Sequence, residues 1–189
     1  MMRIITGKAK GKKLATLEGE ATRPTSERIK GAIFSSIQFE IENRCVLDLF
    51  AGSGQMGLEA LSRGASRVTF IDASREAMEI VKKNAENTGF FKESHFLVSD
   101  YRNYVRKASG REKYDLVFID PPYSLACATE AAVLLARAEL VIPGALVVLE
   151  SGDEQIDVPS LSELGYEVLK SEHYGKKTAV TILLYRGKE

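Results

Sequence analysis

The sequence has no long apolar run, and it has few of the residues that bind metals or form disulfides. No stretch of its 189 residues approaches the roughly 20 apolar residues that span a bilayer, and the N-terminus has no apolar signal-peptide core. Its two cysteines, Cys45 and Cys127, have no metal-type or redox-type partner nearby, and its two histidines, His95 and His173, are far apart. We therefore expect a cytoplasmic protein that binds neither membranes nor metal ions.

Acidic residues are absent from the first thirteen positions, although the whole chain carries no net charge. Residues 1–30 contain eight basic and three acidic residues, so a basic segment precedes a mildly acidic body. A solvated basic surface would explain this charge, but an anionic partner explains it better. Because Lys and Arg neutralise phosphates, nucleic acid is the expected partner.

Short apolar segments alternate with helical patterns from Cys45 onward. The apolar segments are residues 46–49, 68–71, 96–98, 116–119 and 146–149, and the helical stretches between them are 56–63, 75–88, 101–107 and 126–138. Strands that are apolar on both faces and alternate with helices are typical of a parallel sheet covered on both sides. The sequence therefore predicts an α/β fold with a mostly parallel sheet.

The two ends of the chain depart from this alternation. Residues 167–174 and 178–185 predict an antiparallel hairpin at the C-terminus. Residues 3–6 and 13–17 predict a second, smaller hairpin around a glycine-containing turn. We expect residues 1–22 to form a basic nucleic-acid-binding appendage and residues 23–189 to form the main domain.

A glycine-rich loop follows the first of these strands. Residues 52–57 match G-x-G-x-x-G, open a predicted helix and are followed by Asp72, 20 residues after Gly52. This pattern is the fingerprint of dinucleotide-binding folds, in which the acidic residue binds a ribose. S-adenosylmethionine and a nicotinamide dinucleotide both fit the loop alone.

Three carboxylates at predicted strand ends favour one of these two cofactors. Asp48 immediately precedes the loop, where it suits a cationic group better than a pyrophosphate, and Asp72 and Asp100 follow the next two strands. Their alternative role is helix capping. Together they favour S-adenosylmethionine, and the predicted cofactor residues are Asp48, Phe50, Ala51, Gly52, Ser53, Gly54, Asp72, Ala73, Asp100 and Tyr101.

The sequence Asp120-Pro121-Pro122-Tyr123 ends the fourth predicted strand, at the edge where parallel sheets bind ligands. The Asp120 carboxylate and the Pro121 carbonyl can accept hydrogen bonds from an exocyclic base amine and orient its lone pair. Consecutive prolines make a stiff corner, and the Tyr123 ring can stack on an extruded base. A strand-ending turn with a core tyrosine is the alternative. We expect Asp120, Pro121, Pro122 and Tyr123 to form the catalytic motif of a nitrogen methyltransferase.

These motifs resemble the RsmD-type family of 16S ribosomal RNA guanine-N2 methyltransferases over nearly the whole chain. The resemblance lies in residues 3–7 and 11–14, in the linker of residues 23–28, and in residues 48–54, 120–123 and 174–175. It implies a class I methyltransferase fold with seven strands. Gln55 and Met56 depart from the small or β-branched residues more usual in this loop. We expect this departure to affect the packing of the loop more than the identification of the family.

The resemblance also implies a substrate, namely one guanine of 16S rRNA within a small ribosomal subunit or an assembly intermediate. It implies RNA contacts from Arg3, Lys8, Lys10, Lys12, Lys13, Arg23 and Arg28, and we expect a monomer. An adenine-N6 or other nucleic-acid amino-methyltransferase is the nearest alternative. A nicotinamide-dependent oxidoreductase and a non-catalytic RNA-binding assembly factor are the others.

Overall fold

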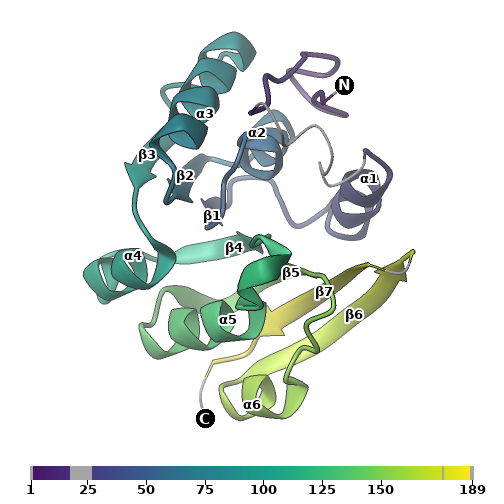
Figure 1. Cartoon of the computed structure of the whole chain (residues 1–189), viewed down its shortest axis with the longest axis vertical. Coiled ribbons are helices and arrows are strands. Elements are labelled where there is room, and N and C mark those ends of the chain that lie inside the picture. Colours follow the sequence, from purple (N-terminus) through teal and green to yellow (C-terminus); the bar gives the residue numbers. More distant parts are fainter. Residues whose placement is uncertain (1, 18–26, 176, 188–189) are drawn as a thin grey trace. The chain divides into compact units, whose positions relative to one another are not determined.

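Two compact units make up the chain, and Figure 1 shows the helices and strands of each. The computed structural model describes residues 2–17, 27–175 and 177–187. The first unit comprises Met1–Asp100 and the second Tyr101–Glu189. No helix among these described residues is long and apolar enough to cross a membrane.

The described residues of the first unit form three parallel strands and three helices. Its elements are α1 (Glu27–Ser36), β1 (Cys45–Asp48), α2 (Gln55–Ser62), β2 (Arg67–Asp72), α3 (Arg75–Thr88) and β3 (Ser94–Val98). The strand order is β3-β2-β1, and Asp48 pairs with Phe70 while Asp72 pairs with Val98. The carboxyl ends of all three strands therefore lie along one edge, where the sequence placed its candidate cofactor residues.

Helix α2 packs closely against β2 because a glycine stands at the contact. A side chain at Gly57 would begin 2.4 Å from the Phe70 ring, so only glycine permits this approach.

Helix α3 is bounded by two residues suited to helix ends. The Ser74 side chain accepts a hydrogen bond from the Ala77 amide, and Gly89 ends the helix with φ 86°.

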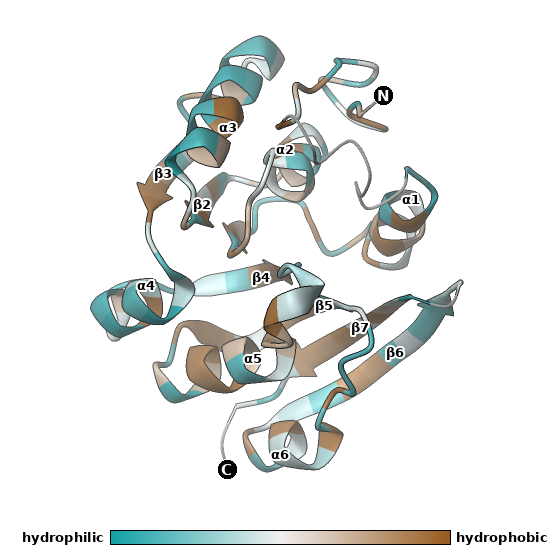
Figure 2. Ribbon diagram, in the orientation of Figure 1, coloured by the Kyte–Doolittle hydropathy of each residue, from teal (hydrophilic) through white to brown (hydrophobic). Residues whose placement is uncertain are grey.

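The part of the second unit that the structure describes contains four strands. Its elements are α4 (Tyr101–Ala108), β4 (Tyr114–Ile119), the 3-10 turn η2 (Tyr123–Leu125), α5 (Ala128–Arg137), β5 (Val141–Ser151), α6 (Val158–Glu163), β6 (Tyr166–Tyr174) and β7 (Thr178–Tyr185). Strands β4 and β5 are parallel, and β7 pairs antiparallel with both β5 and β6. The predicted C-terminal hairpin is confirmed. Figure 2 shows apolar residues along β7 and hydrophilic residues over much of α3 and α4.

The N-terminal segment, residues 2–17, forms a short hairpin rather than two extended strands, and the amides of Ile4 and Leu14 donate across it, to the carbonyls of Lys12 and Met2, both at 2.9 Å. Its only ladder contact within the described residues is an isolated antiparallel bridge between Arg3 and Lys13. It lies beside α2 in Figure 1, with Ile4 and Leu14 buried. Elsewhere in the segment, side chains of helices α2 and α3 bond its backbone groups in place of a strand partner.

Two helix residues make most of these backbone contacts. The Glu59 carboxylate accepts hydrogen bonds from the amides of Ile5, at 2.7 Å, and Thr6, at 3.0 Å. Asn84 accepts from the Ala15 amide and donates to the Ala15 carbonyl, at 2.8 and 2.9 Å. The predicted domain boundary at residues 22 and 23 lies outside the described residues and stays a prediction.

Candidate functional site

The glycine turn between β1 and α2 is tight and tied to β2. Gly52 and Gly54 have φ 52° and 78°, in the left-handed region that favours glycine. The Gly54 amide donates to the Ala51 carbonyl at 2.6 Å, and the Ala51 amide donates to the Ile71 carbonyl at 2.9 Å. The turn thus holds its backbone close to the end of the next strand. Because its glycines have no side chain, nothing bulky at these positions would obstruct a ligand.

Asp72 lies at the end of β2 and holds this turn. One carboxylate oxygen accepts from the Gly52 amide and the other from the Ser74 amide, both at 2.8 Å. The structure therefore brings together the glycine and the carboxylate that the 20-residue spacing singled out. Each oxygen retains a second lone pair, so the half-buried carboxylate can still accept a hydrogen bond from a ribose hydroxyl.

Asp48 is almost fully buried at the end of β1. Its carboxyl accepts a hydrogen bond from the Gly57 amide at 3.0 Å. Burial raises its pKa to about 7, and the nearby Asp72 charge acts in the same direction while the Gly57 bond opposes it. A cation beside Asp48 would stabilise the charged carboxylate, as expected for a group that faces the cationic end of S-adenosylmethionine.

We expect cofactor affinity to depend on pH through Asp48. Below its pKa of about 7 the carboxyl is protonated, so a cationic ligand must displace the proton. Its affinity should therefore fall by up to about tenfold for each pH unit below that pKa. Calorimetry with S-adenosylmethionine between about pH 5.5 and pH 7.5 avoids the range in which α-amino groups titrate, about 7.7–8.0. Affinity should rise with pH and binding should release a proton.

The control for this experiment is Asp48→Asn, which keeps an acceptor for Gly57 but cannot ionise. This variant should bind more weakly, with an affinity that is nearly independent of pH over the same range. If the affinity of the wild-type chain were as independent of pH as that of the variant, Asp48 would not face the cationic group.

The remaining predicted cofactor residues differ in exposure. Phe50 is half-buried, Ala51 and Ser53 are buried, and Ala73 and Asp100 are exposed. Tyr101 is buried at the start of α4, and its hydroxyl donates to Glu130 at 3.0 Å within the second unit. Burial raises the pKa of this phenol, so it stays neutral and acts as a donor.

The motif of residues 120–123 directly follows β4 in the second unit. Asp120 and Tyr123 are half-buried, Pro121 is buried and Pro122 is exposed. Pro122 has φ −52° and ψ 127°, an extended geometry that sends the chain into η2. The stiff corner predicted from the two prolines is thus present.

The Tyr123 ring is held at its edge and on one face. Its hydroxyl donates to the buried Glu150 carboxylate at 3.1 Å and lies 2.8 Å from the Thr178 hydroxyl. A side chain at Gly152 would begin 2.4 Å from the ring, so the ring packs directly on glycine backbone. This arrangement fixes the ring as a flat surface with a set orientation.

Sequence reasoning did not identify the three residues that hold Tyr123. Glu150 and Gly152 lie at and just beyond the end of β5, and Thr178 begins β7, 55 residues after Tyr123. Nothing in their local sequence distinguishes them from other strand and turn residues. Only the pairing of β5 with β7 brings them to the motif.

The predicted RNA-contacting residues form an exposed basic surface on the N-terminal segment. Its exposed members are Arg3, Lys8, Lys10, Lys12 and Lys13. Arg3 pairs with Glu27 at 3.1 Å. Arg28 is exposed on α1, and Arg23 lies outside the described residues.

In the described part of the chain, neither Cys127 nor a group of metal-type residues forms another reactive centre. Burial raises the pKa of the Cys127 thiol, which opposes a role as nucleophile. No group of three or more His, Cys, Asp or Glu residues among those described is placed to hold a metal ion.

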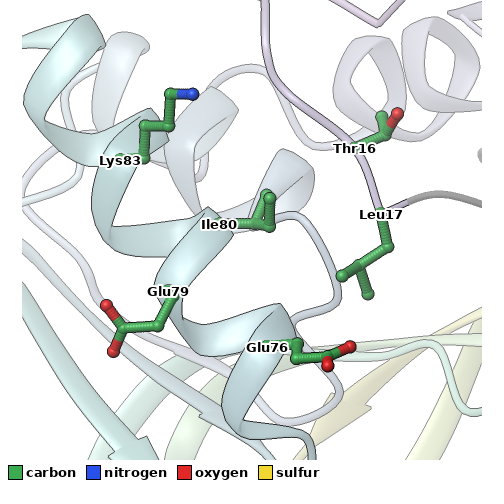
Figure 3. A pocket seen from close by; sticks show the side chains of 6 residues that line it. All are labelled: Thr16, Leu17, Glu76, Glu79, Ile80 and Lys83. Carbon is green, nitrogen blue, oxygen red and sulfur yellow. The ribbon is translucent and has the colours of Figure 1, made fainter.

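A hollow of about 520 Å³ lies between residues 16–17 and helix α3 (Figure 3). Leu17 and Ile80 supply its apolar part. Polar and charged side chains complete the lining, namely Thr16, Glu76, Glu79 and Lys83. None of these six residues was among the predicted site residues.

Comparison with known proteins places these features in a family. The family model described as Conserved hypothetical protein 95 matches residues 2–183. Ribosomal RNA small subunit methyltransferase D of Haemophilus influenzae is 32% identical over 175 residues, which are 92% of this chain and 89% of that protein. The protein of the same name from Escherichia coli is 32% identical over 150 residues, 79% of this chain and 74% of its own length.

A solved structure has the same fold along its whole length. The structure of yhhF from Escherichia coli aligns with a TM-score of 0.83 and 27% identity, covering 99% of both chains. This match confirms the predicted fold class, a mostly parallel α/β methyltransferase fold of seven strands that ends in an antiparallel hairpin.

Proposed function

Because this chain belongs to the Conserved hypothetical protein 95 family, the RsmD family, we propose that it methylates the exocyclic N2 of one guanine in small-subunit (16S) rRNA. The family prediction made from the sequence is confirmed, and so is the predicted cofactor, S-adenosylmethionine. The observation that carries the choice of a base amine is the fixed Tyr123 ring next to Asp120 at the end of β4.

The residues of the first unit fit S-adenosylmethionine. The cofactor supplies an electrophilic methyl group on a positively charged sulfur. Asp48 is buried with a raised pKa, as a partner of a cationic group would be, and the glycine turn leaves space beside it. Asp72 retains acceptor capacity for the ribose, and Asp100 is assigned to the adenine end. These roles follow from the strand-end positions of the three carboxylates.

The residues of the second unit fit a flat base with an amino group. We assign base stacking to the Tyr123 ring, whose orientation Glu150 and Thr178 fix. Asp120 and the Pro121 carbonyl would accept the two amine hydrogens and direct the nitrogen lone pair at the methyl carbon. In that reaction the nitrogen–carbon bond would form as the carbon–sulfur bond breaks, S-adenosylhomocysteine would leave, and the amine would lose its proton to solvent. Such a displacement depends mainly on positioning.

The alternatives are weaker on specific grounds. A nicotinamide enzyme would place a pyrophosphate beside Asp48, a carboxyl whose raised pKa already reflects poor stabilisation of negative charge. An adenine-N6 enzyme would share the Asp-Pro-Pro-Tyr chemistry, so only the product distinguishes it. A non-catalytic RNA-binding factor would have no need of an oriented Tyr123 ring.

The product of the reaction tests the proposal. The purified chain is incubated with S-adenosylmethionine carrying a labelled methyl group and small-subunit rRNA, either free or in subunits. The RNA is then digested to nucleosides. Label in N2-methylguanosine alone supports the proposal, whereas label in N6-methyladenosine would favour the nearest alternative. Comparing free RNA with subunits also identifies the form of substrate.

We assign RNA binding to the exposed lysines of the N-terminal segment, and we expect them to hold phosphates. Replacing Lys8, Lys10 and Lys12 with Gln should weaken RNA binding and reduce the slope of log affinity against log salt by up to about 2–3, at about 0.7–0.9 per lost contact. Phosphate contacts carry little sequence information, so the modified position should not change. A salt titration of rRNA binding measures the slope.

The matched control replaces three exposed basic residues elsewhere, Lys92, Lys107 and Arg111, with Gln. Substitution is preferable to deletion of the segment, because its backbone is bonded to Glu59 and Asn84. Equal slopes for the two triple variants would show that the N-terminal lysines have no special part in RNA binding.

The proposal extends to the setting of the reaction. We propose that the chain acts in the cytoplasm as a monomer, on the small ribosomal subunit or an assembly intermediate. We also propose that residues 1–22 form the RNA-binding part and residues 23–189 the methyltransferase domain. The basic surface and the position of Asp48, Asp72 and Asp120 within the second range support this division.

A further inference from the structure

Gln55 is the first residue of helix α2 and directly follows the glycine turn. Its side chain is 8% exposed, and its buried Oε1 atom has no hydrogen-bond partner within the described structure. Rotating the carboxamide by 180° would place Nε2 in the same buried position. The group can therefore offer either an acceptor or a donor at that position, where the oxygen has no partner among the described residues.

An unpaired buried polar atom is unfavourable, and such atoms in folded proteins usually have a reason. Packing alone does not supply one, because Met or Leu would fill a similar volume without burying an unpaired amide. The neighbouring Met56 is equally buried and apolar. A ligand that pairs with the carboxamide would account for a glutamine at this position.

The place of Gln55 in the fold identifies that ligand. Side chains in a helix tilt toward its N-terminus, so the first residue of α2 directs its Cβ back toward the glycine turn. The first turn of a helix also presents N–H groups without intrahelical partners, which favour an anionic group. Asp48, which favours a cationic group, is bonded to Gly57 in the same turn of helix.

We propose that Gln55 binds the amino-acid part of S-adenosylmethionine through its carboxamide. That part carries both an ammonium and a carboxylate, so it contains a partner for either end of the amide. The assignment goes beyond the residues predicted for the cofactor, which ended at Gly54. It also differs from the expectation that Gln55 affects mainly packing.

Binding measurements on Gln55→Met test this proposal, because Met keeps the volume but removes the amide. The ligands are S-adenosylhomocysteine and methylthioadenosine, which has the adenosine and sulfur but no amino-acid part. We expect the dissociation constant for S-adenosylhomocysteine to rise about 5- to 30-fold. Affinity for methylthioadenosine should stay within about twofold, and the melting temperature of the ligand-free variant should be unchanged or higher.

Met56→Leu is the matched control, a volume-conserving change at the next residue of the same helix. It should change neither affinity. An unchanged dissociation constant for S-adenosylhomocysteine in Gln55→Met would overturn the proposal. So would an equal loss for both ligands, or a lower melting temperature without ligand, since both indicate a structural role. If the wild-type chain failed to bind S-adenosylhomocysteine, the cofactor assignment itself would be wrong.

Discussion

Asp120→Ala should lower the rate of methyl transfer by at least about 10²–10³-fold, the usual effect of removing one preorganised electrostatic group from a reacting centre. The physical reason is that its carboxylate is assigned to the target amine, whose lone pair is otherwise delocalised into the ring. Its position after β4, at the start of the stiff proline corner, places it among rigid elements. Single-turnover transfer of a labelled methyl group to rRNA measures the effect.

Cofactor binding should be nearly unaffected in the same variant, with a dissociation constant within about twofold of wild type. Glu112→Gln, which removes an exposed carboxylate from the same unit, should leave both quantities unchanged. If Asp120→Ala retained a tenth or more of the wild-type rate, or lost cofactor affinity as fully as activity, the assignment of Asp120 to the target amine would fail.

Glu59→Ala should destabilise the protein by about 3–5 kcal/mol, because it removes one partner of a buried ion pair. Glu59 is fully buried and lies 3.3 Å from the ammonium of Lys30, which is 1% exposed. Burial lowers the pKa of Lys30 although Glu59 opposes this shift, so the lysine depends on Glu59 to stay charged. The amides of Ile5 and Thr6 would lose their acceptor as well.

Urea unfolding followed by circular dichroism measures this loss, since the chain has no tryptophan for fluorescence. Glu79→Gln is the control, because Glu79 is an exposed helix carboxylate paired with Lys82 and should contribute less than about 1 kcal/mol. Adding Lys30→Met to Glu59→Ala should recover part of the lost stability by removing the unpaired ammonium. A loss below about 1 kcal/mol for Glu59→Ala would contradict this account of the network.

The parts of the fold that the sequence predicts are those that depend on local pattern. Segments such as residues 46–48 and 68–71 are strands because every residue in them is buried in a covered sheet. The contact between Gly52 and Asp72 follows from a fixed spacing across one strand–helix–strand unit. Such features need no knowledge of distant segments.

The parts that sequence reasoning missed depend on side chains that meet from distant segments. The N-terminal segment reads as a hairpin of two strands, yet its hairpin is short, and Glu59 and Asn84, more than 50 residues away, bond other backbone amides of the segment. In the sequence, Glu59 is one polar residue of a mixed helix. Helix α6 has only six residues, too few to show a periodic pattern.

The residues of the candidate site also fall into two groups, those that the sequence predicts and those that only the structure identifies. Asp48, Asp72 and Asp120 stand out because a carboxylate at a strand end is chemically conspicuous. Gln55 is conspicuous only once its burial and its unpaired oxygen are known. Glu150 and Thr178 become part of the site only through the Tyr123 hydroxyl.

Mass mapping of small-subunit rRNA from cells that lack the gene tests the central proposal most directly. We predict that one N2-methylguanosine disappears from a single position. It should return when the wild-type chain is expressed, but not when Asp120→Ala is expressed at the same level. An unchanged set of N2-methylguanosines, or the loss of a methylated adenine instead, would contradict the proposal.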